Sequence, residues 1–143
     1  AEVRKTGFPW SAALVEREII IAEGTRRCCE YALTFGAAAN IAGGTHHAYA
    51  GHGEGFCLLN DQAIAARWLL DSGRARQVLV VDLDVHQGNG TAAIFAREPR
   101  VFTFSMHGAT NYPARKEHSD LDVPLPDGTT DAAYLAILND TLP

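Results

Sequence analysis

The chain has 143 residues, of which 47% are hydrophobic and 20% are charged, a composition that is ordinary for a globular domain and argues against wholesale disorder. Twelve basic and 17 acidic side chains give a net charge of −5, so the global basic footprint of a nucleic-acid-binding domain is absent. We therefore expect no direct nucleic-acid binding. We also expect no membrane segment, because no apolar run approaches the roughly 18 residues of a membrane span.

Helices and strands are predicted to alternate along the chain, which indicates an α/β fold with a parallel sheet. Ser11 and Asn60 stand where helix N-caps are expected, Gly36 stands where the first helix should end, and Gly24 is expected to interrupt that helix. The helices are predicted over residues 14–35, 61–70, 91–96 and 131–139, and the strands over residues 37–42, 77–83 and 101–105.

Two segments carry further structural expectations. The continuous apolar run over residues 77–83 predicts a strand that is buried on both faces, as in a parallel sheet. Residues 106–128 contain three prolines and are predicted to form a long irregular stretch.

The end of the 77–83 strand carries the sequence Asp82-Leu83-Asp84-Val85-His86. Ligands of α/β sheets gather beyond the carboxyl ends of the strands, and residues two apart in an extended chain point the same way. Carboxylates and an imidazole that converge there suit a divalent transition metal such as zinc. The alternative is that the two Asp side chains cap the following turn and that His86 is merely solvated.

A loop rich in Gly and His runs from Gly43 to Cys57, with three of the six His and five of the 13 Gly. The adjacent His46 and His47 suit general acid–base chemistry, metal binding or a surface pair of no consequence. Phe56 is either the wall of a substrate channel or plain core. Nothing in the sequence shows an activated thiol at Cys57.

The cysteines and the amino terminus indicate a compartment. Cys28, Cys29 and Cys57 form an odd set with one adjacent pair, which is a poor disulfide framework. The first residues have no apolar region of the kind that a signal peptide needs. We therefore expect reduced thiols and a cytoplasmic protein.

Taken together, the motifs resemble a known family. In chain order they are GGTHHA (43–48), GEGFC (53–57), ND (60–61) and VDLDVHQGNG (81–90). They are similar to motifs of the arginase/deacetylase superfamily and, within it, of zinc-dependent histone deacetylase-like amidohydrolases. The Gln-Gly-Asn that follows His86 resembles the class IV branch and its bacterial relatives.

The resemblance implies a three-layer arginase/deacetylase-type fold with a mainly parallel central sheet, and roles for particular residues. Asp84 and His86 would be two of the three protein ligands to zinc. His46 and His47 would be the paired catalytic imidazoles, and Asp82 would orient His46. Because Asn89, the partner of His47, is neutral, the proton affinity of His47 would be lowered.

The resemblance also implies further sites. Gly55 and Phe56 would line the acyl channel. A monovalent cation, usually potassium, would be held near Ser105 and Met106 together with the backbone around Asp82, Asp84 and His86. Arginase-like relatives with two metal ions need an additional carboxylate at the position of Gly88, so a two-metal manganese site is disfavoured.

Two family residues have no match in this chain, namely the third zinc ligand, an Asp, and the carbonyl-polarising Tyr. The candidates Asp127, Asp131, Asp140, Tyr112 and Tyr134 lie outside the expected motifs. Residues 1–143 are therefore expected to be the central portion of the catalytic domain.

The expected function is zinc-dependent hydrolysis of an acylated amine, such as an acetylated or longer-chain acyl-lysine or an acetylpolyamine. The alternatives are a non-catalytic or truncated binding domain with the same fold, and a related hydrolase of small-molecule amides or guanidines.

Overall fold

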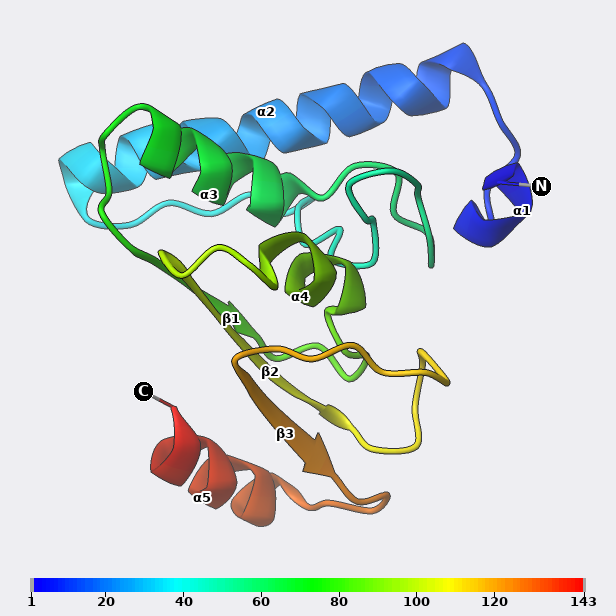
Figure 1. Ribbon diagram of the computed structural model, residues 1–143, viewed down its shortest axis with the longest axis vertical. Coiled ribbons are helices and arrows are strands. Elements are labelled where there is room, and N and C mark those ends of the chain that lie inside the picture. The colour runs from blue at the N-terminus through cyan, green and yellow to red at the C-terminus, as the bar shows by residue number, and fades with distance from the viewer. Residues whose placement is uncertain (1, 143) are drawn as a thin grey trace.

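The computed structural model describes residues 2–142 and confirms the predicted α/β fold (Figure 1). Its sheet has three strands in the order β1-β2-β3, and both strand pairs are parallel. The elements are α1 (Glu2–Thr6), α2 (Ala12–Phe35), α3 (Asp61–Asp71), β1 (Val78–Asp82), α4 (Asn89–Phe95), β2 (Val101–Gly108), β3 (Leu121–Leu125) and α5 (Asp131–Thr141).

The central strand β2 is longer than its neighbours and pairs with them in a staggered way. β1 pairs with the first part of β2, so that its last residue, Asp82, lies beside Ser105. β3 pairs with the second part, from Phe104 opposite Leu121 to Gly108 opposite Leu125. The carboxyl end of β1 therefore reaches the middle of the sheet, beside a buried part of β2.

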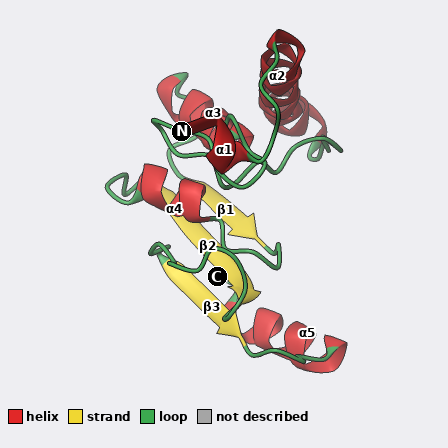
Figure 2. Ribbon diagram, turned by 90° about the vertical axis from the view of Figure 1, so that its right-hand side faces the viewer, coloured by secondary structure: helices red, strands yellow, loops and turns green. Residues whose placement is uncertain are grey.

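Helices lie on both faces of the sheet and give the molecule three layers (Figures 1 and 2). On one face α3 and α4 cover β1 and the start of β2, and Leu70, Phe95 and Val101 are the larger buried side chains of that core. On the other face α5 packs over β2 and β3, against Phe104 and Met106. α2 lies outside α3 (Figure 2).

Capping residues set the ends of the helices as predicted. The side chain of Ser11 accepts from the backbone N–H of Leu14, and that of Asn60 accepts from the N–H of Ala63. Gly36 ends α2 with φ +92°. The interruption expected at Gly24 was wrong, because α2 is continuous. A Cβ at this position would lie 3.0 Å from Nδ2 of Asn40, which indicates close packing between the helix and the loop.

The strand predicted at residues 37–42 was wrong, because the segment is irregular and mostly exposed. The small side chains of three consecutive alanines offer little to pack on a sheet. The segment is held instead by Asn40, whose Nδ2 donates to the carbonyl oxygen of Ile21 and to Oγ1 of Thr25.

The irregular stretch predicted over residues 106–128 was also partly wrong. β2 continues to Gly108, and residues 121–125 form β3. Pro124 lacks an N–H, but within the described sheet β3 is an edge strand, where such a donor is dispensable.

The burial predicted for both faces of β1 does not hold in residues 2–142. Val78 and Val80 pack on the core under α3 and α4, whereas Leu79 and Val81 on the other face are 47% and 38% exposed. The helix α5 covers the neighbouring strands and leaves this part of the sheet open. Among the helices of residues 2–142, none combines the length and apolar character needed to cross a membrane.

Candidate active site

The loop that carries the two histidines is clamped by the N-cap and the first residue of α3. The carboxylate of Asp61 accepts from the backbone N–H groups of Gly44 and Thr45, just before the pair. Asn60 donates from Nδ2 to the carbonyl oxygens of His46 and Ala48. Because these contacts bracket the pair on both sides, the orientation of the two imidazoles depends on the start of a rigid helix.

His46 and His47 lie side by side and are both buried, with ring centroids 4.1 Å apart. Nδ1 of His46 is 2.5 Å from Oδ2 of Asp82, the last residue of β1. Nδ1 of His47 is 2.7 Å from Oδ1 of Asn89, the first residue of α4. Each ring therefore has one nitrogen engaged by a side chain from a different element, and its Nε2 is left for chemistry.

The two histidines differ in proton affinity. Burial opposes charge on His46, but the hydrogen bond and the negative charge of Asp82 outweigh it, so the pKa of His46 is raised. Burial lowers the pKa of His47, and nearby positive charge on His46 and His86 lowers it further. The neutral Asn89 offsets this only in part, in line with the lower proton affinity expected for His47.

Asp84 and His86 lie beside the pair on the turn after β1. Oδ1 of Asp84 is 2.9 Å from Nδ1 of His86 and 3.9 Å from Nε2 of His46. The strand ends at Asp82, so alternation along an extended chain is not what brings these side chains together. Asp82 accepts from the N–H of Asp84, and Asp84 from the N–H of His86, so both carboxylates also cap the turn.

The donor atoms of Asp84 and His86 are a carboxylate oxygen and an imidazole nitrogen. A carboxylate oxygen and an imidazole nitrogen are donors that zinc accepts, and a catalytic zinc ion takes about three protein ligands. Within residues 2–142 no group of three His, Cys, Asp or Glu side chains converges as a metal site. Asp84 and His86 nevertheless supply two donor atoms of kinds that zinc accepts.

Gly88 has no room for the additional carboxylate that a two-metal centre would require. A Cβ at this position would collide with Oδ2 of Asp82, the atom that holds His46. Any side chain here would displace that contact.

Asn89 contacts residues that the sequence analysis did not assign to the site. Its Nδ2 donates to Oε1 of Glu54 at 3.0 Å and to the hydroxyl of Tyr49 at 3.1 Å. Tyr112 donates its hydroxyl proton to the same Oε1 at 2.8 Å, and its ring lies 5.0 Å from that of His47. The glycines on both sides of Glu54 were the signal available in the sequence, since they allow a close turn.

Gly55 and Phe56 form a tight turn next to His47. Both have positive φ, +52° and +63°, and the backbone of Glu54 pairs with that of Cys57 across the turn. A Cβ on Gly55 would lie 2.7 Å from Cδ2 of His47. The ring of Phe56 is 64% exposed and packs edge-on against Phe8, so the core interpretation of Phe56 is wrong.

The residues expected near a monovalent cation lie close together. Ser105 is the register partner of Asp82, and Ser105 and Met106 are both buried. Oγ of Ser105 is 3.0 Å from Nδ1 of His107, which is also buried.

Cys57 does not have the environment of a nucleophile. Its side chain is buried, and burial raises the pKa of the thiol to about 11. The negative charges of Glu18 and Asp61 act in the same direction.

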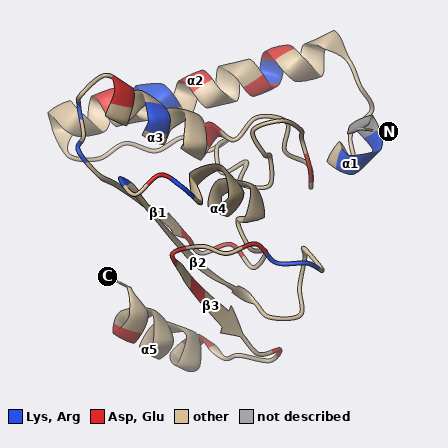
Figure 3. Cartoon of the chain, in the orientation of Figure 1, with Lys and Arg blue, Asp and Glu red and all other residues tan. Residues whose placement is uncertain are grey.

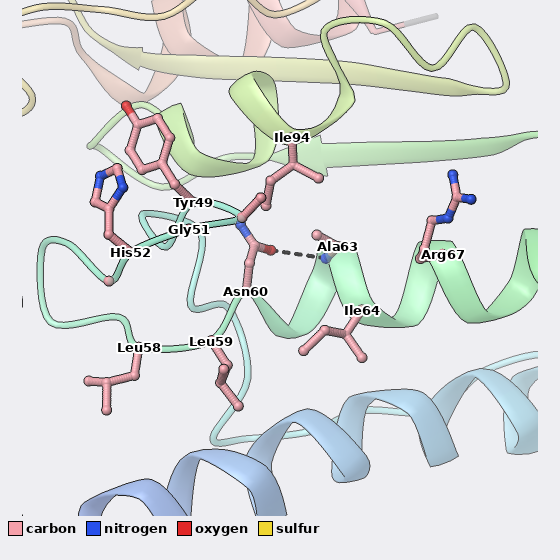
Figure 4. Close-up of a pocket in the computed structure, with 12 residues that line it drawn as sticks. Tyr49, Gly51, His52, Leu58, Leu59, Asn60, Ala63, Ile64, Arg67 and Ile94 are labelled. Atoms are coloured by element: carbon pink, nitrogen blue, oxygen red, sulfur yellow. Dashed lines mark hydrogen bonds between the residues drawn. The ribbon is translucent and has the colours of Figure 1, made fainter.

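A pocket of about 460 Å³ is lined by residues 49–53 of the histidine-containing loop, by the start of α3 and by Ile94 of α4 (Figure 4). Tyr49 and His52 stack at one end, with rings 4.5 Å apart, and Arg67 lies at the other. Neither His46 nor His47 lines it. Charged residues of both signs lie along α2 (Figure 3), and Arg67 of α3 forms an ion pair with Glu98 after α4.

Residues 3–143 match the histone deacetylase domain family. The chain belongs to the histone deacetylase family. It is 54% identical over 135 residues to an uncharacterized protein of Picosynechococcus sp., covering 94% of this chain and 45% of the relative. It is 36% identical over 107 residues to a probable deacetylase of Archaeoglobus fulgidus, covering 68% of this chain and 30% of the relative.

Solved structures show the same histone deacetylase fold. The chain superposes on an HDAC homologue from Aquifex aeolicus with a TM-score of 0.78 and 27% identity, covering 93% of this chain and 41% of the other. The fold is therefore of the arginase/deacetylase type, and residues 2–142 form part of it. The chain spans less than half the length of these relatives.

Proposed function

We propose that the whole protein hydrolyses acylated amines, such as acetyl-lysine, longer acyl-lysine or acetylpolyamine, with the aid of zinc. The observation that carries this proposal is the paired arrangement of His46 and His47, in which Nδ1 of each ring is hydrogen-bonded to a separate side chain. The adjacent Asp84 and His86 are suitable zinc ligands. Bound zinc would polarise the acyl carbonyl and acidify a water molecule.

The two histidines suit different halves of the reaction. His47 has the lowered pKa, so it is neutral at neutral pH and its Nε2 accepts the proton of the attacking water. His46, paired with Asp82, has the raised pKa and retains positive charge more readily. A protonated imidazole of the pair then donates to the leaving amine, which would otherwise depart as a poor leaving group.

The surrounding residues position the substrate. Gly55 lets the backbone pass close to His47, and the exposed ring of Phe56 is available to the acyl chain. We propose that these two residues line the acyl channel. We also propose that a potassium ion beside Asp82, Ser105 and Met106 supports the end of β1, with the backbone around Asp84 and His86.

The test combines zinc content with turnover of a fluorogenic acetyl-lysine amide by the whole protein. His47→Ala should abolish turnover and leave zinc bound, whereas Asp84→Asn and His86→Ala should lower the zinc content. Loss of zinc in the His47→Ala variant would refute the assignment of His47. Zinc binding without turnover in the unsubstituted protein would favour a non-catalytic binding domain, and turnover of small amides alone would favour the related small-molecule hydrolase.

A further inference from the structure

A chain of hydrogen bonds connects His47, through the buried Asn89, to a second carboxylate. Nδ1 of His47 meets Oδ1 of Asn89 at 2.7 Å, and Nδ2 of Asn89 donates to Oε1 of Glu54 at 3.0 Å. Asn89 is 1% exposed, and the side chain of Glu54 is 22% exposed. Along this chain of hydrogen bonds, Glu54 therefore acts on His47 only through Asn89.

The contacts of Asn89 Nδ2 define which way the amide is turned. Tyr49 donates its only hydroxyl proton to Oε1 of Glu117 at 3.2 Å, so its oxygen can only accept from Asn89. An ionised Glu54 is likewise an acceptor. With two acceptors beside it, Nδ2 must face Glu54 and Tyr49, and Oδ1 must face His47. A flipped amide would place its oxygen against both acceptors.

The orientation of the amide in turn selects one tautomer of His47. Oδ1 of Asn89 accepts, so a neutral His47 must carry its proton on Nδ1, and Nε2 is left with its lone pair. We infer that Glu54 is a positioning residue that sets the tautomer of His47 through Asn89 and keeps Nε2 ready to accept a proton. The purpose of the free Nε2 rests on the proposed function, whereas the tautomer itself does not.

Asn89 keeps the carboxylate one residue away from the imidazole. A carboxylate in direct contact with His47 would favour its charged form, as Asp82 does for His46. The neutral amide transmits the orientation set by Glu54 without transferring its full charge. This arrangement suits an imidazole that must be neutral and must carry its one proton on Nδ1.

The direct test is the nitrogen NMR spectrum of His47 in the whole protein, which distinguishes a proton on Nδ1 from one on Nε2. We expect only the Nδ1–H form in the unsubstituted protein and a mixture of tautomers in Glu54→Leu, which removes the charged one of the two acceptors and leaves only the weaker hydroxyl of Tyr49 to orient the amide. Glu54→Gln retains an oxygen of the same reach and should restore the Nδ1–H form. Tyr112→Phe removes the other donor to the same oxygen of Glu54 and should not change the tautomer.

An unchanged Nδ1–H form in Glu54→Leu would overturn the inference, as would an equal mixture in the Tyr112→Phe control. If Glu54→Leu does not fold, Asn89→Asp provides a second test. This change places two carboxylates in contact and should lower kcat. Adding Glu54→Gln, which can donate to the new carboxylate, should raise kcat again several-fold. If the two substitutions act independently, so that the change in kcat of the double variant is the product of the two single changes, the inference is overturned.

The experiments distinguish a failure of the proposed function from a failure of the positioning role. In Glu54→Leu we expect kcat to fall about tenfold with a smaller change in KM, as for other residues that orient a reacting group from behind. A protein without any hydrolase activity whose His47 tautomer still responds to Glu54→Leu would refute the proposed function and support the positioning role. If activity requires His47 but the tautomer of His47 does not change when residue 54 is substituted, the proposed function is supported and the positioning role is refuted.

Discussion

Oδ2 of Asp82 lies 2.5 Å from Nδ1 of His46, and both side chains are buried. The equivalent position behind His47 is held by the uncharged Asn89. Two adjacent imidazoles in one loop therefore receive different partners, one ionic and one neutral. The pKa of His46 is raised and that of His47 is lowered, so His46 holds a proton more readily while His47 stays neutral more readily.

The first prediction concerns this order of protonation. In an NMR pH titration, His47 should lose its proton at lower pH than a free imidazole, and His46 at higher pH. Asp82→Asn should bring the pKa of His46 down, because burial then acts without its charged partner. Simultaneous titration of the two rings near the ordinary His value would contradict the prediction.

The same shifts have opposite effects on stability. The raised folded-state pKa of His46 means that its pair with Asp82 stabilises the fold fully below the unfolded pKa of about 6.5, and this contribution is lost as the pH rises through the folded pKa. His47 has a lowered folded-state pKa, so protonation of the unfolded chain reduces stability as the pH falls. Unfolding of Asp82→Asn should therefore differ most from that of the unsubstituted protein at mildly acidic pH.

The second prediction concerns the clamp at the start of α3. Asp61 is 1% exposed and accepts from the N–H groups of Gly44 and Thr45. Asp61→Asn should reduce the free energy of unfolding by about 2 kcal/mol or more, because buried donors then lose a charged acceptor. Asp71→Asn at the exposed end of the same helix is the matched control and should change it by about 0.5 kcal/mol or less. Urea unfolding measures both, and equal effects would contradict the clamp.

The third prediction concerns the approach of the backbone to His47. Gly55→Ala places a methyl group 2.7 Å from Cδ2 of His47 at a φ of +52°, so it should destabilise the protein by about 1–2 kcal/mol and lower kcat. Gly51→Ala in the same loop meets open space and should be near neutral. Thermal unfolding and turnover would be compared for the two variants. A fully active, fully stable Gly55→Ala variant would show that His47 can move aside.

The fourth prediction concerns Cys57. With its pKa at about 11, only about one thiol in a thousand is ionised at pH 8, so alkylation by iodoacetamide should be roughly 100-fold slower than for an ordinary cysteine. Burial should slow it further. The same residue in urea-unfolded protein is the control and should react at the ordinary rate. Rapid modification of Cys57 in the folded protein would contradict the assigned environment.

Local pattern predicted the helices and the caps well, because each depends on residues that are neighbours in the chain. Ser11, Asn60 and Gly36 act within one turn of their own helix, so their effect is readable from spacing. The predictions for residues 37–42 and 121–125 were wrong because a strand depends on residues that are far apart in the chain. A strand exists only where a partner strand is available, and the alanines have none in the described sheet whereas Leu121–Leu125 has β2.

The sequence by itself determined the family, since the order of its His, Asp and Gly motifs is that of the histone deacetylase family, and it named the candidate residues. Only the tertiary structure decided how those residues work together. Glu54 and Asn89 are 35 residues apart, and His47 and Asn89 are 42 apart, so no periodicity relates them. Their contacts arise because α4 and the histidine loop meet at the carboxyl end of β1, where packing of separate elements sets the partner, the tautomer and the pKa of each imidazole.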